Sequence, residues 1–178
     1  MSRQHLLEQS KYLTGRVNPV HLIKEATPIH TINRFAKSHG YMKDLMIKRE
    51  DQTDDVYGGN KVRNLEYVLG EALHRKCNSV STLIPYGSNF TGALAAQAGK
   101  VGIVPYLSQF VLQRNSQIEA HVKFGQSHGA QMKTFHSNYG FAGALAHAGI
   151  SRLNPNRYYI EPGASSVLGA LGHANALL

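Results

Sequence analysis

The pattern of apolar and polar positions predicts alternating strands and helices from about residue 44 onward. The predicted strands are short apolar runs at 45–47, 79–84, 103–107, 131–135 and 158–160. Apolar or small residues recur at helical spacing in the segments between them, which predicts helices at 61–76, 88–100, 113–127, 140–152 and 165–178. Repeated strand–helix units imply an α/β fold: an open, mostly parallel twisted sheet with helices on both faces.

The helix expected at 61–76 has the clearest apolar face, formed by Val62, Leu65, Leu69, Ala72 and Leu73. The first forty residues are less regular. A short helix is expected at 5–12, an extended segment at 27–29, where a proline follows Thr27, and one or two helical turns over 29–35. Pro105 lacks an N–H group, which argues against a central, fully paired position for the strand at 103–107.

Ligands of open α/β sheets usually bind beyond the carboxyl ends of the strands, so a site is expected in the turns after Ile47, Ile84 and Ile160. In the first of these turns, Gly58 and Gly59 permit a sharp bend. Residues Asn60 and Lys61 follow.

Asn60 is a candidate N-cap, which places Lys61 in the first turn of the helix. The helix dipole and the nearby Arg63 favour a neutral amine there, the form that attacks an aldehyde. On this evidence alone, an ordinary surface lysine after a glycine turn remains the alternative.

Composition excludes several classes of protein. The chain has 178 residues, 42% of them hydrophobic, which is enough for one domain or for one domain and part of another. Its net charge of +8 comes from scattered residues without a block of five like charges, so we expect a solvated basic surface and no nucleic-acid partner. The single Cys77 excludes an internal disulfide. No signal-peptide core or membrane-spanning stretch is apparent, so we expect a soluble, cytoplasmic protein with no membrane partner.

Other polar residues carry weaker signals. His121, His128 and His136 are widely spaced and lack companion ligands, so no metal site is predicted. Glu50 and Asp51 would point to opposite faces of a strand, so we expect them to hold the loop through ion pairs and not to form an acid–base pair. For Tyr57 and Tyr86 two roles are open: each ring either lines the cleft or packs against neighbouring side chains.

Three ordered motifs resemble one enzyme family. The run IKRED…GGNKVRNLE at 47–66, with TPIHTI upstream at 27–32, closely resembles the aminocyclopropane-carboxylate deaminase and D-cysteine desulfhydrase family. The segment YGSNF at 86–90 falls where that family has its QSNH-like motif, and PGASS at 162–166 followed by LGALG at 168–172 resembles its PGGSS…LGALGY segment. The resemblance implies the tryptophan-synthase-β-like, or type II, fold of pyridoxal-phosphate enzymes.

The resemblance also implies roles for particular residues. Lys61 would be the Schiff-base lysine that carries pyridoxal 5′-phosphate and moves protons on the substrate. Asn60 and Asn89 would contact the cofactor, and Ser88, Asn89 and Phe90 would face the substrate. Ser88 is also a candidate N-cap, and the two roles are compatible. The implied reaction is that of a lyase or deaminase, which releases ammonia and a keto acid from a small amino acid.

The chain departs from the family pattern in three ways. Asn64 stands where the family usually has a phosphate-contacting lysine, the segment 84–87 reads IPYG where Gly-Gly-x-Gln is usual, and Phe90 replaces a histidine or glutamine. The chain resembles only the N-terminal half of the family. The implied division is 1–55 as part of the large domain, 56–160 as the small α/β domain and 161–178 as the return into the large domain.

The half that this resemblance leaves out carries the glycine-rich phosphate loop, the partner of the pyridine nitrogen and tyrosines that face the substrate. We therefore expect a homodimer or a second chain that supplies the rest. The alternative is an inactive truncated remnant, or a partner subunit that folds without independent catalysis.

Overall fold

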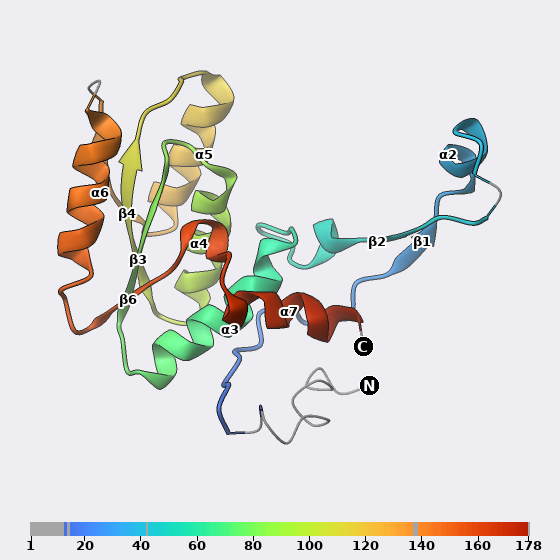
Figure 1. The fold of residues 1–178 in the computed structure, drawn as a ribbon, viewed down its shortest axis with the longest axis horizontal. Coiled ribbons are helices and arrows are strands. Elements are labelled where there is room, and N and C mark those ends of the chain that lie inside the picture. The colour runs from blue at the N-terminus through green and yellow to red at the C-terminus, as the bar shows by residue number, and fades with distance from the viewer. Residues whose placement is uncertain (1–12, 14, 42, 137–138, 178) are drawn as a thin grey trace.

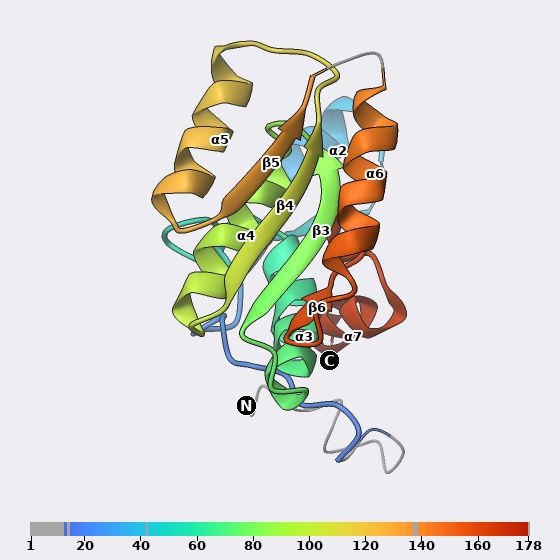
Figure 2. The ribbon, with the colours of Figure 1, turned by 90° about the vertical axis from the view of Figure 1, so that its left-hand side faces the viewer.

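The computed structural model describes residues 13, 15–41, 43–136 and 139–177. Its centre is a four-stranded parallel sheet with strand order β5-β4-β3-β6 (Figure 2). The strands are β3 (Ser79–Pro85), β4 (Val104–Phe110), β5 (Gln131–Phe135) and β6 (Arg157–Tyr159). This sheet confirms the predicted α/β fold. The helix expected at 5–12 lies outside the described residues.

Five helices surround the sheet and follow the predicted order: α3 (Lys61–His74), α4 (Asn89–Lys100), α5 (Ser116–Ser127), α6 (Gly140–Ser151) and α7 (Val167–Leu177). Helix α6 covers one face, α4 and α5 cover the other, and α7 packs along α3 (Figures 1 and 2). Helix α5 begins three residues later than expected because the Asn115 side chain caps it, accepting a hydrogen bond from the Ile118 N–H at 2.8 Å. No helix in the described part of the chain is long and apolar enough to cross a bilayer.

The main core lies between the sheet and helices α3 and α4. Four of the five residues predicted on the apolar face of α3 are fully buried there: Val62, Leu65, Leu69 and Ala72. The fifth, Leu73, keeps 38% of its surface exposed at the end of the helix. Cys77 is buried in the same core. A smaller cluster beneath α6 consists of Leu83, Ala144 and Ala148.

Strand β4 is central, so the edge position inferred from Pro105 is wrong. The N–H groups of a parallel strand alternate between its two neighbours, and the Val104 N–H bonds to Asn78 on the β3 side. The Pro105 nitrogen therefore faces β5, where pairing begins only at Tyr106 opposite Gln131. A proline at this position removes no bond from the sheet.

Residues 45–47 do not belong to the parallel sheet, which corrects a second expectation. Strand β2 (Met46–Lys48) pairs antiparallel with β1 (Ile29–Thr31), and helix α2 (Asn33–Ser38) lies between them. The helical turns predicted over 29–35 are only partly present: residues 29–31 form strand β1, and helix α2 begins at Asn33. Figure 1 shows this two-stranded ribbon extending away from the sheet.

Candidate active site

Close packing and backbone geometry both demand glycine in the turn before α3. A β-carbon on Gly58 would lie 2.3 Å from the Asp51 carbonyl oxygen, and Gly59 has a φ of 136°. The Thr53 hydroxyl closes the turn by donating to the Gly59 carbonyl and accepting from the Gly59 N–H, both at 2.9 Å. These contacts fix where the helix starts, and with it the position of Lys61.

Asp54 ties the same loop to helix α4. Its carboxylate accepts hydrogen bonds from the Tyr57 N–H and the Gln97 side chain, and it forms an ion pair with Lys100. Burial raises the pKa of Asp54, but the hydrogen bonds from Lys100, Tyr57 and Gln97 outweigh it and leave the pKa below its ordinary value. A charged carboxylate therefore anchors the loop at neutral pH.

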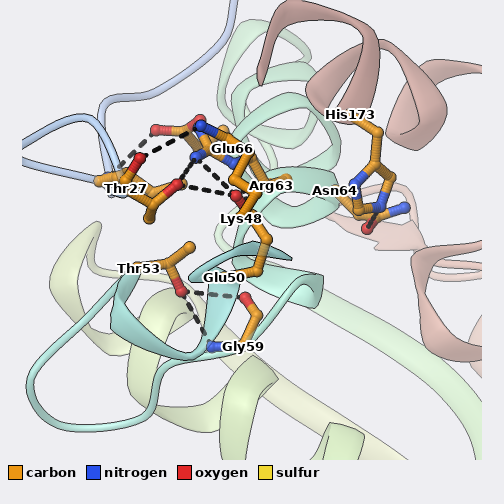
Figure 3. Close-up of polar contacts among 10 residues, drawn as sticks. Thr27, Lys48, Glu50, Thr53, Gly59, Arg63, Asn64, Glu66 and His173 are labelled. Carbon is orange, nitrogen blue, oxygen red and sulfur yellow. Dashed lines mark hydrogen bonds and ion pairs between the residues drawn. The ribbon is translucent and has the colours of Figure 1, made fainter. Parts of the chain in front are cut away.

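A second anchor lies on the other side of the loop, at Glu50 (Figure 3). Its two carboxylate oxygens accept bonds from the Arg63 guanidinium at 2.8 and 3.0 Å, and the Thr27 hydroxyl donates to one of them at 2.9 Å. Burial opposes the charge of Glu50, but Arg63 and Thr27 outweigh burial and lower its pKa. Asp51 pairs with Arg49 at 2.7 Å, so both acids form the predicted ion pairs, but only the pair of Glu50 with Arg63 ties the loop to α3.

Lys61 is the first residue of α3 and is half-buried. Its amine lies against the turn of the PGASS motif, since a β-carbon at Gly163 would be 3.5 Å from Lys61 Nζ and 3.4 Å from Ser165 Oγ. Gly163 has a φ of 66°, which suits glycine. The fold therefore brings together two of the three motifs that carry the resemblance.

The predicted N-cap role of Asn60 is wrong. Asn60 has helical dihedral angles and its side chain makes no capping bond, because a side chain reaches the second or third helical N–H only from an extended backbone. The first helical bonds run instead from the Val62 N–H to Gly59 and from the Arg63 N–H to Asn60. The Asn60 side chain is left exposed beside Lys61.

Asn64, the departure from the family pattern, is buried and fully engaged (Figure 3). Its amide nitrogen donates to the Ala164 carbonyl at 3.2 Å, and its amide oxygen lies 2.8 Å from Nε2 of His173 on α7. Asn64 thus fastens both the PGASS turn and α7 to α3. A lysine at this position would lack the acceptor that His173 uses.

The third motif lies at the end of β3. Gly87 has a φ of 68°, and a β-carbon there would lie 2.3 Å from the Ile118 side chain, so only glycine fits this turn. Ser88 caps α4 by accepting from the Phe90 N–H at 3.3 Å, as predicted. Asn89 is exposed beside it, and the Phe90 side chain is buried in the main core.

Ser88 and Asn89 line an open groove of about 320 Å³ between the end of β3 and helix α5. Tyr86, directly after β3, also lines it, and the other walls include Gln113 from the turn after β4 and His121 from α5. His121 hydrogen-bonds the Gly87 carbonyl at 3.1 Å. Lys61 is not among the residues that line this groove.

The turn after β4 is the part of the groove that sequence reasoning missed. The carboxyl end of β4 lies beside that of β3, whereas the site was expected only in the turns after Ile47, Ile84 and Ile160. The turn after Ile47 was selected on the wrong premise, since β2 is not in the parallel sheet. That loop still leads to Lys61, because α3 follows it directly.

The two tyrosines have different surroundings. The Tyr57 ring packs against Phe124 with ring centroids 5.1 Å apart and lies so close to Gly92 that a β-carbon there would be 2.3 Å away. Tyr86 lines the groove and donates from its hydroxyl to Glu119 at 2.8 Å. Tyr57 is therefore a packing residue, and Tyr86 lines the cleft.

The burial of His173 near Lys61 and Arg63 makes the docking of α7 sensitive to pH. Burial lowers the pKa of His173 below its ordinary 6.5, and nearby Lys61 and Arg63 lower it further, against the opposing charge of Glu50. A histidine with a lowered pKa in the folded state contributes stability above about pH 6.5, and the contribution declines as the pH falls below that value.

We therefore expect the free energy of unfolding to fall as the pH drops below about 6.5. Urea denaturation across this window measures it. The variant His173→Gln, which cannot be protonated, should have a flatter profile. An equal slope in both proteins would assign the acid sensitivity to other groups.

Comparisons with known proteins agree with the fold. No protein-family model matches the chain. A protein of Pyrococcus horikoshii named "Putative 1-aminocyclopropane-1-carboxylate deaminase" is 30% identical over 170 residues, which cover 93% of this chain and 50% of that protein. A D-cysteine desulfhydrase of Yersinia pseudotuberculosis is 33% identical over 103 residues, 58% of this chain and 28% of that enzyme.

A solved structure shares both fold and sequence. The crystal structure of an ACC deaminase homologue matches 98% of this chain and 51% of its own chain, with a TM-score of 0.76 and 27% identity. The chain therefore spans about half the length of the relatives it matches. That family uses pyridoxal phosphate. The ordered motifs, the fold and these matches show that the chain belongs to the 1-aminocyclopropane-1-carboxylate deaminase and D-cysteine desulfhydrase family.

Proposed function

We propose that this chain supplies Lys61 as the pyridoxal-phosphate lysine of a lyase or deaminase that acts on a small amino acid and releases ammonia and a keto acid. The observation that carries the proposal is the placement of the Lys61 amine against the turn at Gly163. The loop before Lys61 is anchored through Glu50 and Asp54, so the amine is held in position before any ligand arrives.

The residues around Lys61 fit part of the cofactor. Gly163 leaves open space beside Nζ, where any side chain would take up room next to the amine. Asn60 and Asn89 are exposed and free to contact the ring or its substituents. Asn64 does not fit a phosphate-binding role, because both ends of its amide are already bonded within the protein.

Bound pyridoxal phosphate supplies the electron sink that acidifies the carbon beside the amino group of the substrate. The protein supplies position and proton transfer. Lys61 would hold the cofactor and carry a proton to or from that carbon. Ser88, at the N-terminus of α4, lies among free backbone N–H groups that favour a substrate carboxylate.

Chemical trapping tests the assignment of Lys61. The chain is incubated with pyridoxal phosphate, reduced with borohydride and digested, and the modified peptide is identified by mass spectrometry. We expect the label on Lys61, and Lys61→Ala should lose it. The matched control is Lys123→Ala, which removes an exposed lysine from helix α5. A label that stays after Lys61→Ala would sink the assignment.

The second candidate function is a partner subunit without independent catalysis. The observation that favours it is Asn64, which stands in place of a phosphate-contacting lysine and has both ends of its amide bonded within the protein. Turnover of D-cysteine or 1-aminocyclopropane-1-carboxylate separates the two. The isolated chain should form keto acid and ammonia if it is an enzyme. Trapping at Lys61 without turnover would support the partner-subunit candidate.

A further inference from the structure

Helix α6 is apolar on the side that faces away from the sheet as well as on the side that packs against it. Ala144 and Ala148 are buried against the sheet. Six exposed residues at helical spacing form the opposite side, here called the outer face: Phe141, Ala142, Leu145, Ala146, Gly149 and Ile150. A surface helix normally carries polar residues toward water, and a helix that is apolar all round is a buried one. The outer face is therefore expected to be covered.

The outer face lies away from the candidate site. Figure 1 shows α6 at one edge of the molecule, and helices α3 and α4, which carry Lys61 and follow Ser88, pack on the other side of the sheet. What covers the outer face is therefore a question independent of the proposed function. A bilayer is not the answer to it, because α6 has 12 residues and a spanning helix needs about 20.

Charge favours a second copy of this chain as the cover. The net charge is +8, so two copies repel each other wherever their basic residues meet. The segment from Tyr139 to Ser151 has no charged residue, and Arg152 at its end is paired with Glu161 at 3.3 Å. Two copies can therefore meet here without bringing like charges together, whereas a charged partner would find nothing on the outer face to pair with.

The outer face is also self-complementary in shape. Large and small side chains share it: Phe141, Leu145 and Ile150 project, and Ala142, Ala146 and Gly149 lie between them. We propose that two copies of the chain pair α6 with α6, antiparallel, about a two-fold axis between Leu145 and Ala146. Leu145 of each copy then faces Ala146 of the other, so that a large side chain packs into the space above a small one.

The exposed area is close to what a stable pair needs. Phe141, Leu145 and Ile150 keep 54%, 52% and 68% of their surface exposed. Tyr139 and Leu153, at the two ends of the helix, keep 80% and 79%. With the small residues between them, these side chains supply on the order of 700 Å² per copy, against roughly 800 Å² in a standard interface. An interface of this size predicts a dimer that dissociates in the micromolar range.

Sedimentation tests the pairing. The full 178-residue chain is centrifuged without cofactor at about 1–200 µM, which spans the expected dissociation constant. We expect a monomer–dimer equilibrium that Leu145→Lys weakens about tenfold or more, the range of an interface anchor. Leu145 is half exposed and outside the core clusters, so this variant should fold, which circular dichroism checks. The matched control is Met46→Lys, because Met46 is 72% exposed on β2 and should leave the equilibrium unchanged.

Cross-linking tests the geometry, since the native Cys77 is buried. Leu145→Cys places the two thiols beside the axis and should give a disulfide-linked dimer on mild oxidation. Phe141→Cys places them about 13 Å apart along the helices and should not.

Three results would overturn the proposal: a monomer over the whole concentration range, a dimer broken by Met46→Lys but not by Leu145→Lys, or cross-linking through Phe141→Cys instead. A monomer that binds neutral phospholipid vesicles would likewise assign the outer face to a lipid surface. Leu145→Lys should leave the trapping of Lys61 unchanged, so this proposal and the proposed function can fail separately.

Discussion

Replacing Gly172 by alanine should lower the free energy of unfolding by about 3 kcal/mol or more, at the upper end of the range for overpacking a close contact. A β-carbon at Gly172 would lie 2.0 Å from the Arg63 carbonyl oxygen and 2.5 Å from its carbonyl carbon. These are backbone atoms within α3, so they cannot rotate away as a side chain would. Helix α7 would have to move off α3.

The close approach extends along α7, since a β-carbon at Gly169 would lie 2.3 Å from the Ala164 carbonyl oxygen. Urea denaturation of Gly172→Ala measures the loss. Gly149→Ala is the control, because nothing lies within 4 Å of the added carbon in α6. That variant should gain about 0.5 kcal/mol from helix propensity. Equal stability of Gly172→Ala and the unmodified chain would contradict the tight packing of α7.

The second large effect is expected from Glu50→Ala, which should lower the free energy of unfolding by about 2–3 kcal/mol. Removing this carboxylate leaves the Arg63 guanidinium buried without its ionic partner, and breaking a buried pair in this way typically costs about 3–5 kcal/mol. We take a lower value because 21% of the Glu50 side chain remains exposed, against 9% for Arg63. Thr27 would keep its bond to Arg63 but could not neutralise the charge.

Thermal and urea unfolding of Glu50→Ala measure this effect. Asp51→Ala is the matched control, because its pair with Arg49 is exposed and should contribute nothing measurable. The pKa of Glu50 lies below its ordinary 4.5, so the stability that it contributes should be present above about pH 4.5 and lost as the pH falls further. If Asp51→Ala were the more damaging change, the Glu50–Arg63 pair would not be the main anchor of the loop.

The expected disturbance from Glu50→Ala should reach the candidate site. Glu50 holds the loop to α3, and Lys61 opens α3 where that loop ends. We therefore expect less trapped pyridoxal phosphate on Lys61 in this variant, under conditions where it is still folded. Unchanged labelling would indicate that the contacts of Asp54 and Thr53 are sufficient to hold the amine.

Much of this architecture could be predicted from the sequence. The helices from 61 onward and the strands of the parallel sheet came from apolar periodicity, which each segment expresses within its own residues. The glycine turn before α3 was also local, because the positive φ of Gly59 leaves few alternatives to glycine. The prediction failed where a neighbouring strand determined the position of a segment in the sheet. Pro105 is tolerated in a central strand only because β5 starts pairing one residue later.

The sequence alone determined the order of strands and helices, the position of Lys61 at the start of α3 and the three motifs that identify the family. Only the tertiary structure decided which motifs meet. Asn64 and Ala164 are 100 residues apart, yet their hydrogen bond fixes the turn that faces Lys61. The tertiary structure also placed Gln113 and His121 in the groove with Ser88. The physical reason is range: helices, strands and turns follow from neighbours along the chain, whereas these contacts depend on how distant helices pack over the sheet.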